Sequence, residues 1–134
     1  MTLKLDQLQA RLDTVLGPAL KALQRERGEI TITVSADDYP DVALCLRDHA
    51  ELRFQQMIDL CGLDYSSYKN HSWDGARYCV VLHLLSIEHN WRVRLKVLVP
   101  DDDLPVVASV NDIWAAANWF EREAFDMYGI VFEG

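Results

Sequence analysis

Residues 78–99 read YCVVLHLLSIEHNWRVRLKVLV, and this stretch predicts the centre of the fold. Two apolar-rich runs, Tyr78–Ile87 and Trp91–Val99, are separated by three polar residues, a length typical of a β-hairpin turn. In the second run apolar and basic side chains alternate with the two-residue period of a strand that has one buried face. The basic side chains of this run are Arg92, Arg94 and Lys96. The sequence therefore predicts an antiparallel hairpin with one apolar face and one basic face.

The basic row on this hairpin admits two interpretations. It is either a solvated sheet face whose charges discourage edge aggregation, or a binding stripe matched to the acidic C-terminal end, within the chain or across an interface. His83 lies inside the first run. We expect it to be a hydrogen-bonded sheet or core histidine rather than a catalytic base, because the sequence identifies no partner for it.

The N-terminal part of the chain predicts helices followed by a strand. Leucines and a valine at helical spacing predict a helix over residues 5–16. Gly17-Pro18 then predicts a break and a second, short helix that ends near Arg25, so that residues 1–27 form N-terminal helices. After Gly28, strict alternation predicts a strand over residues 30–34.

Three further elements are predicted before the hairpin. Asp38 is expected to cap a helix that ends near His49. Its predicted inner stripe consists of Tyr39, Val42, Ala43 and Leu46. A looser alternation predicts a strand from Leu52 to Gly62, and the polar stretch 66–75, which closes with Asp-Gly, predicts a loop.

A long helix is predicted near the C-terminus. Ser109-x-x-Asp112 resembles a capping box and Gly129 suits the C′ position, so the predicted helix runs over 110–128 within segment 109–130. Its predicted apolar stripe consists of Ile113, Ala117, Phe120, Ala124 and Met127. Together the elements predict a single-domain α+β sandwich over residues 1–134, with helices packed on one face of a mostly antiparallel sheet.

Composition narrows the classes of function. The 134 residues carry 13 Lys and Arg against 21 Asp and Glu, a net charge of -8, which disfavours nucleic acid as a partner. No run approaches the roughly 20 apolar residues of a membrane-spanning helix, and the charged N-terminus does not resemble a signal peptide, so we expect a cytosolic chain. Residues 101–134 hold one base and eight acids. This block predicts a solvated acidic face or a face that meets a basic partner.

The sequence shows no motif for a metal or a cofactor. Cys45, Cys61 and Cys79 are spaced 16 and 18 residues apart without a Cys-x-x-Cys motif, which predicts reduced thiols rather than zinc or iron–sulfur ligands. The six glycines form no nucleotide-binding loop, and the four histidines do not stand at metal-ligand spacing. We therefore expect this chain to bind no cofactor and no metal.

Three carboxylates and a guanidinium gather within six residues of the C-terminal helix. They belong to Glu121, Arg122, Glu123 and Asp126. Paired carboxylates suit acid–base catalysis or a hard metal ion. At about 100° per residue, however, these three carboxylates diverge around the helix, so we expect no catalytic or metal site among them.

The same helix predicts a polar ridge with aromatic neighbours. Arg122 can pair with Asp126 one turn later, and Asn118 lies one turn earlier on the same side. Trp114 and Trp119 flank the ridge, and Trp and Arg are the residue types that most often anchor interfaces. One of the two tryptophans is expected in the core, and Trp119 is the better interface candidate.

Residues 109–130, SVNDIWAAANWFEREAFDMYGI, resemble the signature of the C-subunit family of bacterial NADH-quinone oxidoreductase, respiratory complex I. The stretch 54–65 and the 78–99 hairpin are also similar to that family, so the resemblance covers roughly residues 50–134. The signature and interface candidates are Trp114, Asn118, Trp119, Glu121, Arg122, Glu123, Asp126 and Gly129.

The resemblance implies a cofactor-free component of the hydrophilic arm. In such a complex electrons pass from NADH through FMN and iron–sulfur clusters, all held by other subunits, to quinone. The implied partners are the D-subunit and the iron–sulfur subunits, on the cytoplasmic side of the inner membrane. Family members continue past Gly134 into a Gly-His-Pro segment and an Arg-rich tail, so the resemblance also implies a C-terminally truncated chain.

Other functions stay open beside this one. A homologous subunit of a related membrane-bound hydrogenase-type complex could share the signature. A free-standing enzyme would use Glu123 or Asp126 with His83 as acid and base, but the carboxylates diverge and no nucleophile accompanies them. A self-sufficient NADH-binding protein would show saturable NADH binding.

Overall fold

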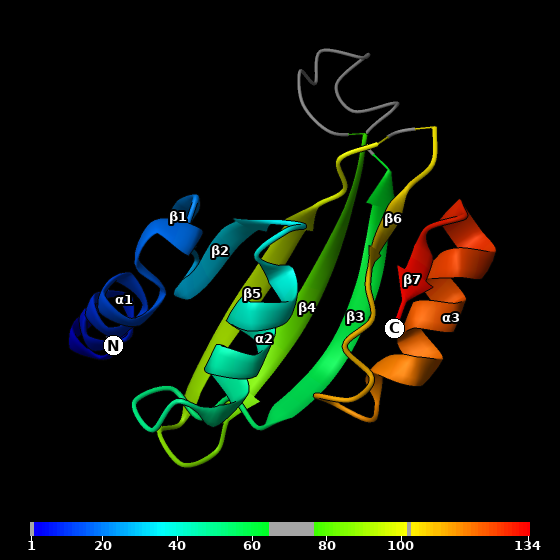
Figure 1. Cartoon of the computed structure of the whole chain (residues 1–134). Helices are drawn as coiled ribbons and strands as arrows, with labels where there is room; N and C mark the ends of the chain where they lie inside the picture. The colour runs from blue at the N-terminus through cyan, green and yellow to red at the C-terminus, as the bar shows by residue number, and fades with distance from the viewer. Residues whose placement is uncertain (1, 65–76, 102) are drawn as a thin grey trace.

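A five-stranded sheet with strand order β1-β2-β5-β4-β3 forms the middle of the molecule in the computed structural model, which describes residues 2–64, 77–101 and 103–134 (Figure 1). Its strands are β1 (Ala22–Glu26), β2 (Glu29–Ser35), β3 (Gln56–Asp64), β4 (Tyr78–Ser86) and β5 (Trp91–Leu98). The β2–β5 pairing is parallel, and the other pairings of this sheet are antiparallel. The predicted loop at 66–75 lies outside the described residues.

Helices and a second, small sheet complete the fold. The helices are α1 (Thr2–Leu16), the 3-10 helix η1 (Gly17–Ala19), α2 (Tyr39–Asp48) and α3 (Ala117–Tyr128). Strands β6 (Val106–Ala108) and β7 (Val131–Glu133) pair in parallel. In Figure 1, α1 lies at the β1–β2 end of the large sheet and α3 at the β3 end, beside β6 and β7. The predicted α+β class with a mostly antiparallel sheet is confirmed.

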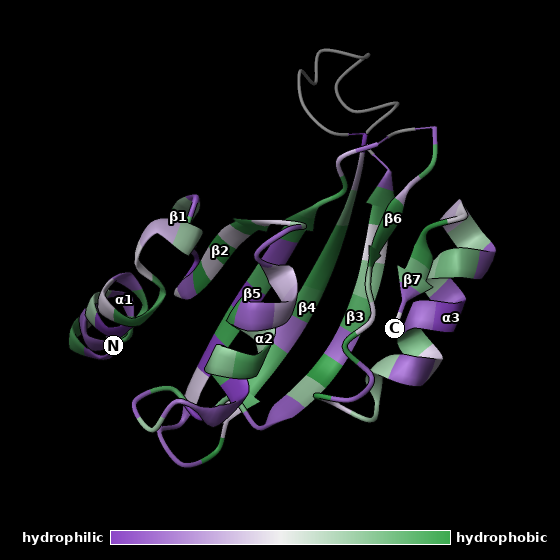
Figure 2. Cartoon of the chain, viewed as in Figure 1, coloured by the Kyte–Doolittle hydropathy of each residue, from purple (hydrophilic) through white to green (hydrophobic). Residues whose placement is uncertain are grey.

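The predicted hairpin forms β4 and β5. The two strands pair from Cys79 opposite Leu98 to Ser86 opposite Trp91. Trp91, Val93, Leu95 and Val97 of β5 are buried, whereas its basic side chains lie on the opposite face of the sheet, an alternation visible in Figure 2. The β4–β5 pair therefore has one face in the core, and we call its other face the open face of the sheet.

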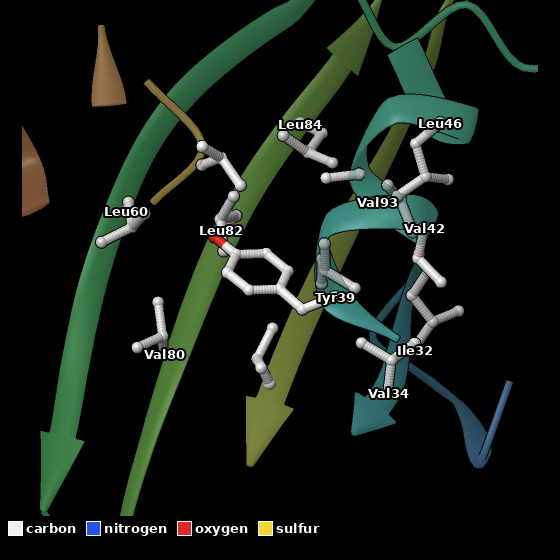
Figure 3. Close-up of a cluster of buried hydrophobic side chains, with 14 of the residues drawn as sticks. Ile32, Val34, Tyr39, Val42, Leu46, Leu60, Val80, Leu82, Leu84 and Val93 are labelled. Carbon is white, nitrogen blue, oxygen red and sulfur yellow. The ribbon is translucent and has the colours of Figure 1, made fainter. Parts of the chain in front are cut away.

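The helices share one hydrophobic core with the inner face of the sheet. α1 contributes Leu8 and Leu12, and the predicted stripe of α2 is inside this core. Figure 3 shows the ring of Tyr39, from α2, lying beside Leu82 of β4 and facing the strand that carries Leu60. The prediction that the helices pack on one face of the sheet is confirmed by this shared cluster.

The prediction for the N-terminal region is wrong after Ala19. Residues 22–26 form an edge strand instead of a second helix. Arg27 and Gly28 have φ values of 53° and 78°, and two successive positive φ angles make the two-residue turn that suits the twist of a hairpin. This turn places Leu23 opposite Ile32, where it packs against the core. Sheet pairing and burial of one leucine therefore override the local preference for a helix.

Strand β3 begins later than predicted. Leu52 and Phe54 are fully buried, but they lie in the connection before the strand, where the Phe54 N–H donates to the carbonyl of Leu46 over 2.8 Å. The pairing with β4 shifts register between Met57 and Asp59. Ile58 lies at this irregularity and is 44% exposed, which explains why the alternation in the sequence is loose.

Helix α3 begins at Ala117, seven residues after the predicted start. The preceding residues form turns in which the N–H groups of Ile113 and Trp114 donate to the carbonyl of Val110. The end is as predicted, because Gly129 has a φ of 73° and accommodates the left-handed C-cap. The predicted apolar stripe is wrong at Met127, which is 65% exposed.

The end of α3 approaches the sheet closely at Gly62 of β3. A Cβ atom at this position would lie 2.9 Å from Cδ2 of Tyr128 and 3.0 Å from Cδ1 of Ile130. Real Cβ atoms do not approach other atoms so closely, so the glycine is required by space rather than by backbone conformation. The end of α3 and the residues after it rest directly on this bare stretch of β3.

Replacement of this glycine is predicted to destabilise the fold. Gly62→Ala forces Tyr128 and Ile130 to move, and overpacking of this kind costs about 1–3 kcal/mol. The free energy of unfolding in urea measures the change. The control is Cys61→Ala, at an exposed neighbour on the same strand, which should change stability by less than about 0.5 kcal/mol. Equal effects of the two substitutions would contradict the close approach.

Candidate functional site

Glu121 occupies the buried side of α3. Its side chain is 5% exposed although it carries a carboxylate. The Ser109 hydroxyl donates to Oε1 over 2.6 Å, and the Val110 backbone N–H donates to Oε2 over 2.9 Å. Burial raises the pKa of Glu121 above its usual value, and these two hydrogen bonds partly oppose that rise. The carboxylate therefore fastens α3 to the segment that follows β6.

A buried phenol lies near this carboxylate. The hydroxyl of Tyr39 is buried and has no hydrogen-bond partner among the residues that the structure describes. Burial raises the pKa of Tyr39, and the charge of Glu121 raises it further. Tyr39 thus stays neutral inside the core.

Two further hydrogen bonds hold the turns that precede α3. The Trp114 indole Nε1–H donates to the carbonyl of Phe54 over 3.0 Å, and Trp114 is 4% exposed. Nη1 of Arg47, in α2, donates to the carbonyl of Ile113 over 3.1 Å. Together with the Glu121 contacts, these bonds fix the position of α3 from its N-terminal side.

The exposed surface of α3 carries aromatic, apolar and charged side chains. Trp119, opposite the buried side, is 70% exposed, and the exposed Phe125 and Met127 lie on the two flanks of the helix, about 160° apart. We call Trp119, Arg122, Glu123 and Asp126 the outer cluster; these four residues line a hollow of about 170 Å³. In Figure 2 hydrophobic and hydrophilic bands alternate along this helix. Exposed aromatic side chains among charges are typical of protein interfaces.

A second hollow, of about 250 Å³, lies beside the first. Asn118, Arg122 and Phe125 line it from α3, and Phe132 of β7 is also part of its wall. Arg122 therefore borders both hollows. It makes no ion pair with any residue that the structure describes, and neither do Glu123 and Asp126, so the predicted Arg122–Asp126 pair is not formed in this part of the chain.

The structure divides the predicted site residues into three groups. The outer cluster faces outward together with Asn118. Trp114 and Glu121 point into the core, and Gly129 caps the helix. The prediction that the three carboxylates cannot converge on one ion is confirmed, because Glu121 is buried whereas Glu123 and Asp126 face outward. Phe125 and Met127 were not predicted as surface residues. Hydrophobicity alone places apolar side chains on the buried side of a helix, whereas in α3 Glu121 takes one of the buried positions.

The open face of the large sheet carries a hydrogen-bonded histidine and aspartate. Nδ1 of His83 lies 2.6 Å from Oδ1 of Asp59, directly across from it on β3. His83 is therefore a hydrogen-bonded sheet histidine, as expected. No pattern in the sequence indicated Asp59 as the partner, because that pairing depends on the strand register. Neither Arg92 nor Arg94 forms an ion pair with a described acid of α3.

Neither a metal-binding group nor a membrane-spanning helix is found among the described residues. Within residues 2–64, 77–101 and 103–134, no group of three or more His, Cys, Asp or Glu side chains is placed to hold a metal ion. No described helix has both the length and the apolar character needed to cross a bilayer. The described fold is an α+β domain whose outer cluster exposes aromatic and charged side chains, a mixture that is enriched at protein interfaces in general.

Comparison with known proteins identifies the family of this chain. Residues 32–134 match the family described as "Respiratory-chain NADH dehydrogenase, 30 Kd subunit". The chain is 60% identical, over all of its 134 residues, to the C-subunit of NADH-quinone oxidoreductase from Leptothrix cholodnii, and it spans 67% of that protein. The chain therefore belongs to the family of this respiratory-chain subunit, and the resemblance carried by residues 109–130 is confirmed.

Two solved structures share the fold. The trypsin-resistant fragment of Nqo5 superposes with a TM-score of 0.80 at 26% identity, with 96% of each chain covered. A chain of the membrane-bound sulfane sulfur reductase, an archaeal respiratory membrane complex, superposes with a TM-score of 0.74 at 25% identity, over 96% of this chain and 71% of that one. The fold thus occurs in more than one kind of respiratory assembly.

The buried carboxylate predicts a specific dependence of stability on pH. Because the pKa of Glu121 is raised in the folded state, the folded chain holds this proton at pH values where the unfolded chain has released it. Stability from this group is therefore full below the usual carboxyl pKa of 4.5 and is lost as the pH rises through the folded value. Glu121→Gln should remove this loss, measured as the free energy of unfolding in urea across that pH range.

The control for this measurement lies on the same helix. Glu123→Gln removes one carboxylate from the exposed side, so it matches the change in net charge without touching the buried contacts. If both substitutions change the pH dependence equally, the buried carboxylate is not its source.

The two tryptophans provide a second matched pair. Trp114→Phe removes the indole donor and leaves the Phe54 carbonyl without it, which should cost about 1–3 kcal/mol of stability. Trp119→Phe, on the exposed side, should cost less than about 0.5 kcal/mol. Thermal or urea unfolding of the two variants tests the assignment. An equal loss at both positions would show that Trp119 is also part of the core.

Proposed function

We propose that this chain is a structural, cofactor-free component of the peripheral arm of a proton-translocating NADH:quinone oxidoreductase. In this proposal the chain catalyses nothing by itself. It supports electron transfer from NADH, through FMN and iron–sulfur clusters held by other subunits, to quinone. The assembly holds it at the cytoplasmic side of the inner membrane. The proposed partners are the D-subunit and the iron–sulfur subunits.

The observation that carries this proposal is the outer face of α3. A helix fixed by buried polar contacts exposes a tryptophan, a phenylalanine and a methionine next to charges that are unpaired among the described residues. Aromatic side chains and arginine are the types most enriched where subunits meet. Family membership indicates the kind of assembly in which the chain takes part. The exposed side of α3 is the surface that would contact the D-subunit.

A second candidate function is the equivalent role in a different respiratory membrane complex. The superposition on the archaeal sulfane sulfur reductase chain supports it. The higher identity to the C-subunit of NADH-quinone oxidoreductase, 60% against 25%, favours the first proposal. Purification of the chain from its native membranes, followed by identification of the proteins that co-purify, distinguishes the two.

The docking role predicts a selective loss of binding. Trp119→Ala should weaken binding to the purified D-subunit from the same organism by at least about tenfold, because a central exposed tryptophan is the type of residue whose loss costs more than about 1.4 kcal/mol. Isothermal titration calorimetry gives the dissociation constants. Ile87→Ala, at a side chain that is 63% exposed in the β4–β5 turn, serves as the control and should leave binding unchanged.

Two results would contradict this proposal. An unchanged dissociation constant for Trp119→Ala would show that α3 is not part of the interface with the D-subunit. Saturable binding of NADH by the isolated chain would contradict the cofactor-free role, for which a flat titration is expected.

A further inference from the structure

We infer that the outer cluster of α3 binds a basic side chain, an arginine or a lysine, presented by the polypeptide segment of the partner that docks there. This inference rests on the proposed function, because it names the chemistry of the partner at the same surface. It requires a site that is negative, that has room for a side chain, and that offers a flat aromatic face.

The spacing along α3 places the required groups on one stripe. Trp119, Glu123 and Asp126 stand at positions i, i+4 and i+7. At about 100° per residue they fall within about 60° of one another around the helix axis. Side chains three or four residues apart are neighbours on a helix surface, so the two carboxylates lie close enough to share one guanidinium or ammonium group. The hollow of about 170 Å³ lies among these same residues.

The charges at this site favour a cation from outside the described chain. Neither Glu123 nor Asp126 makes an ion pair with a described residue. Residues 101–134 carry eight acids and one base, Arg122. The basic row of β5 lies on the open face of the sheet, whereas α3 shares the core with the opposite face. The chain's own strand cations are thus on the wrong side to neutralise the outer cluster.

The exposed tryptophan selects for the same kind of ligand. Trp119 is 70% exposed, and an indole face attracts a guanidinium or ammonium group that lies over it. An arginine can stack on the indole and use its planar fork on a carboxylate at the same time. Arg122, which also lines the hollow, would repel a second cation. The site therefore favours a single basic side chain with an acidic neighbour in the partner.

Competing occupants make different demands on these residues. An apolar segment would depend on Trp119 and on one flanking apolar side chain, Phe125 or Met127, and would be indifferent to the carboxylates. A second copy of this chain would present its own acidic α3 face, and two such faces repel. A basic segment alone depends on both the indole and the carboxylates, and its binding weakens as salt rises.

The test compares two double variants in binding to the purified D-subunit. Glu123→Gln with Asp126→Asn removes the two outer carboxylates. Glu26→Gln with Glu29→Gln removes two acids from the β1–β2 hairpin and changes the net charge equally. The first variant should weaken binding by about tenfold or more and flatten its salt dependence, whereas the control should stay within about twofold of the wild type. Equal affinities for the two variants would overturn the inference.

A second measurement does not depend on the D-subunit. The indole N–H resonance of Trp119, assigned with Trp119→Phe, is followed by NMR during titration with a penta-arginine peptide and with a penta-glutamate peptide. The arginine peptide should shift the resonance saturably in the wild type and not in Glu123→Gln with Asp126→Asn. No shift, or an equal shift with both peptides, overturns the inference.

The two measurements separate failure of the inference from failure of the proposed function. If the wild type does not bind the D-subunit but the arginine peptide shifts Trp119, the partner is wrong and the cation site stands. If the wild type binds the D-subunit and neither the carboxylate variant nor the peptide has an effect, the docking role stands and the inference is wrong. Concentration-dependent dimers that disappear in Trp119→Ala would also overturn it, because the face would then bind a second copy.

Discussion

The buried carboxylate of Glu121 is the constraint on which the C-terminal third of this structure depends. A charged group inside a protein is tolerated when hydrogen bonds compensate it, and here a hydroxyl and a backbone N–H do so. Both donors belong to the segment after β6, so the contact joins two parts of the chain. Because a helix can satisfy these donors in only one rotation about its axis, the carboxylate also decides which side of α3 faces outward.

Packing at the two ends of α3 reinforces that orientation. The bare backbone at Gly62 lets Tyr128 and Ile130 rest on β3, while the Trp114 indole ties the preceding turns to Phe54. A helix held at three points is a rigid support, and rigid supports position binding residues better than loops do. The helix backbone that carries Trp119 is thereby held in one orientation, which is the property that a docking surface in a multi-subunit assembly needs.

Much of the fold follows from periodicity in the sequence, and the exceptions have physical causes. The β4–β5 hairpin and α2 were predictable because their apolar side chains recur at the spacing of the element that buries them. Strand β1 was not predictable, because most of its side chains are exposed and its position is set by pairing with β2 through the Arg27–Gly28 turn. Pairing with β4 also sets the register of β3. A register shift there exposes Ile58 and disturbs the alternation of apolar and polar residues in the sequence. In α3 the burial of Glu121 was not predictable, because hydrophobic periodicity assigns buried positions to apolar side chains. Its two hydrogen-bond donors also lie outside the helix.

If α3 docks as proposed, its outer face is covered by another protein in the assembled complex. Hydroxyl-radical footprinting of the chain, free and within the purified complex, measures this cover by comparing the oxidation rates of Trp119 and Met127 with that of Ile87 in the β4–β5 turn. All three side chains are more than 60% exposed in the free chain. Docking through α3 predicts strong protection of Trp119 and Met127 in the complex. Unchanged oxidation of these two side chains in an intact complex would contradict it.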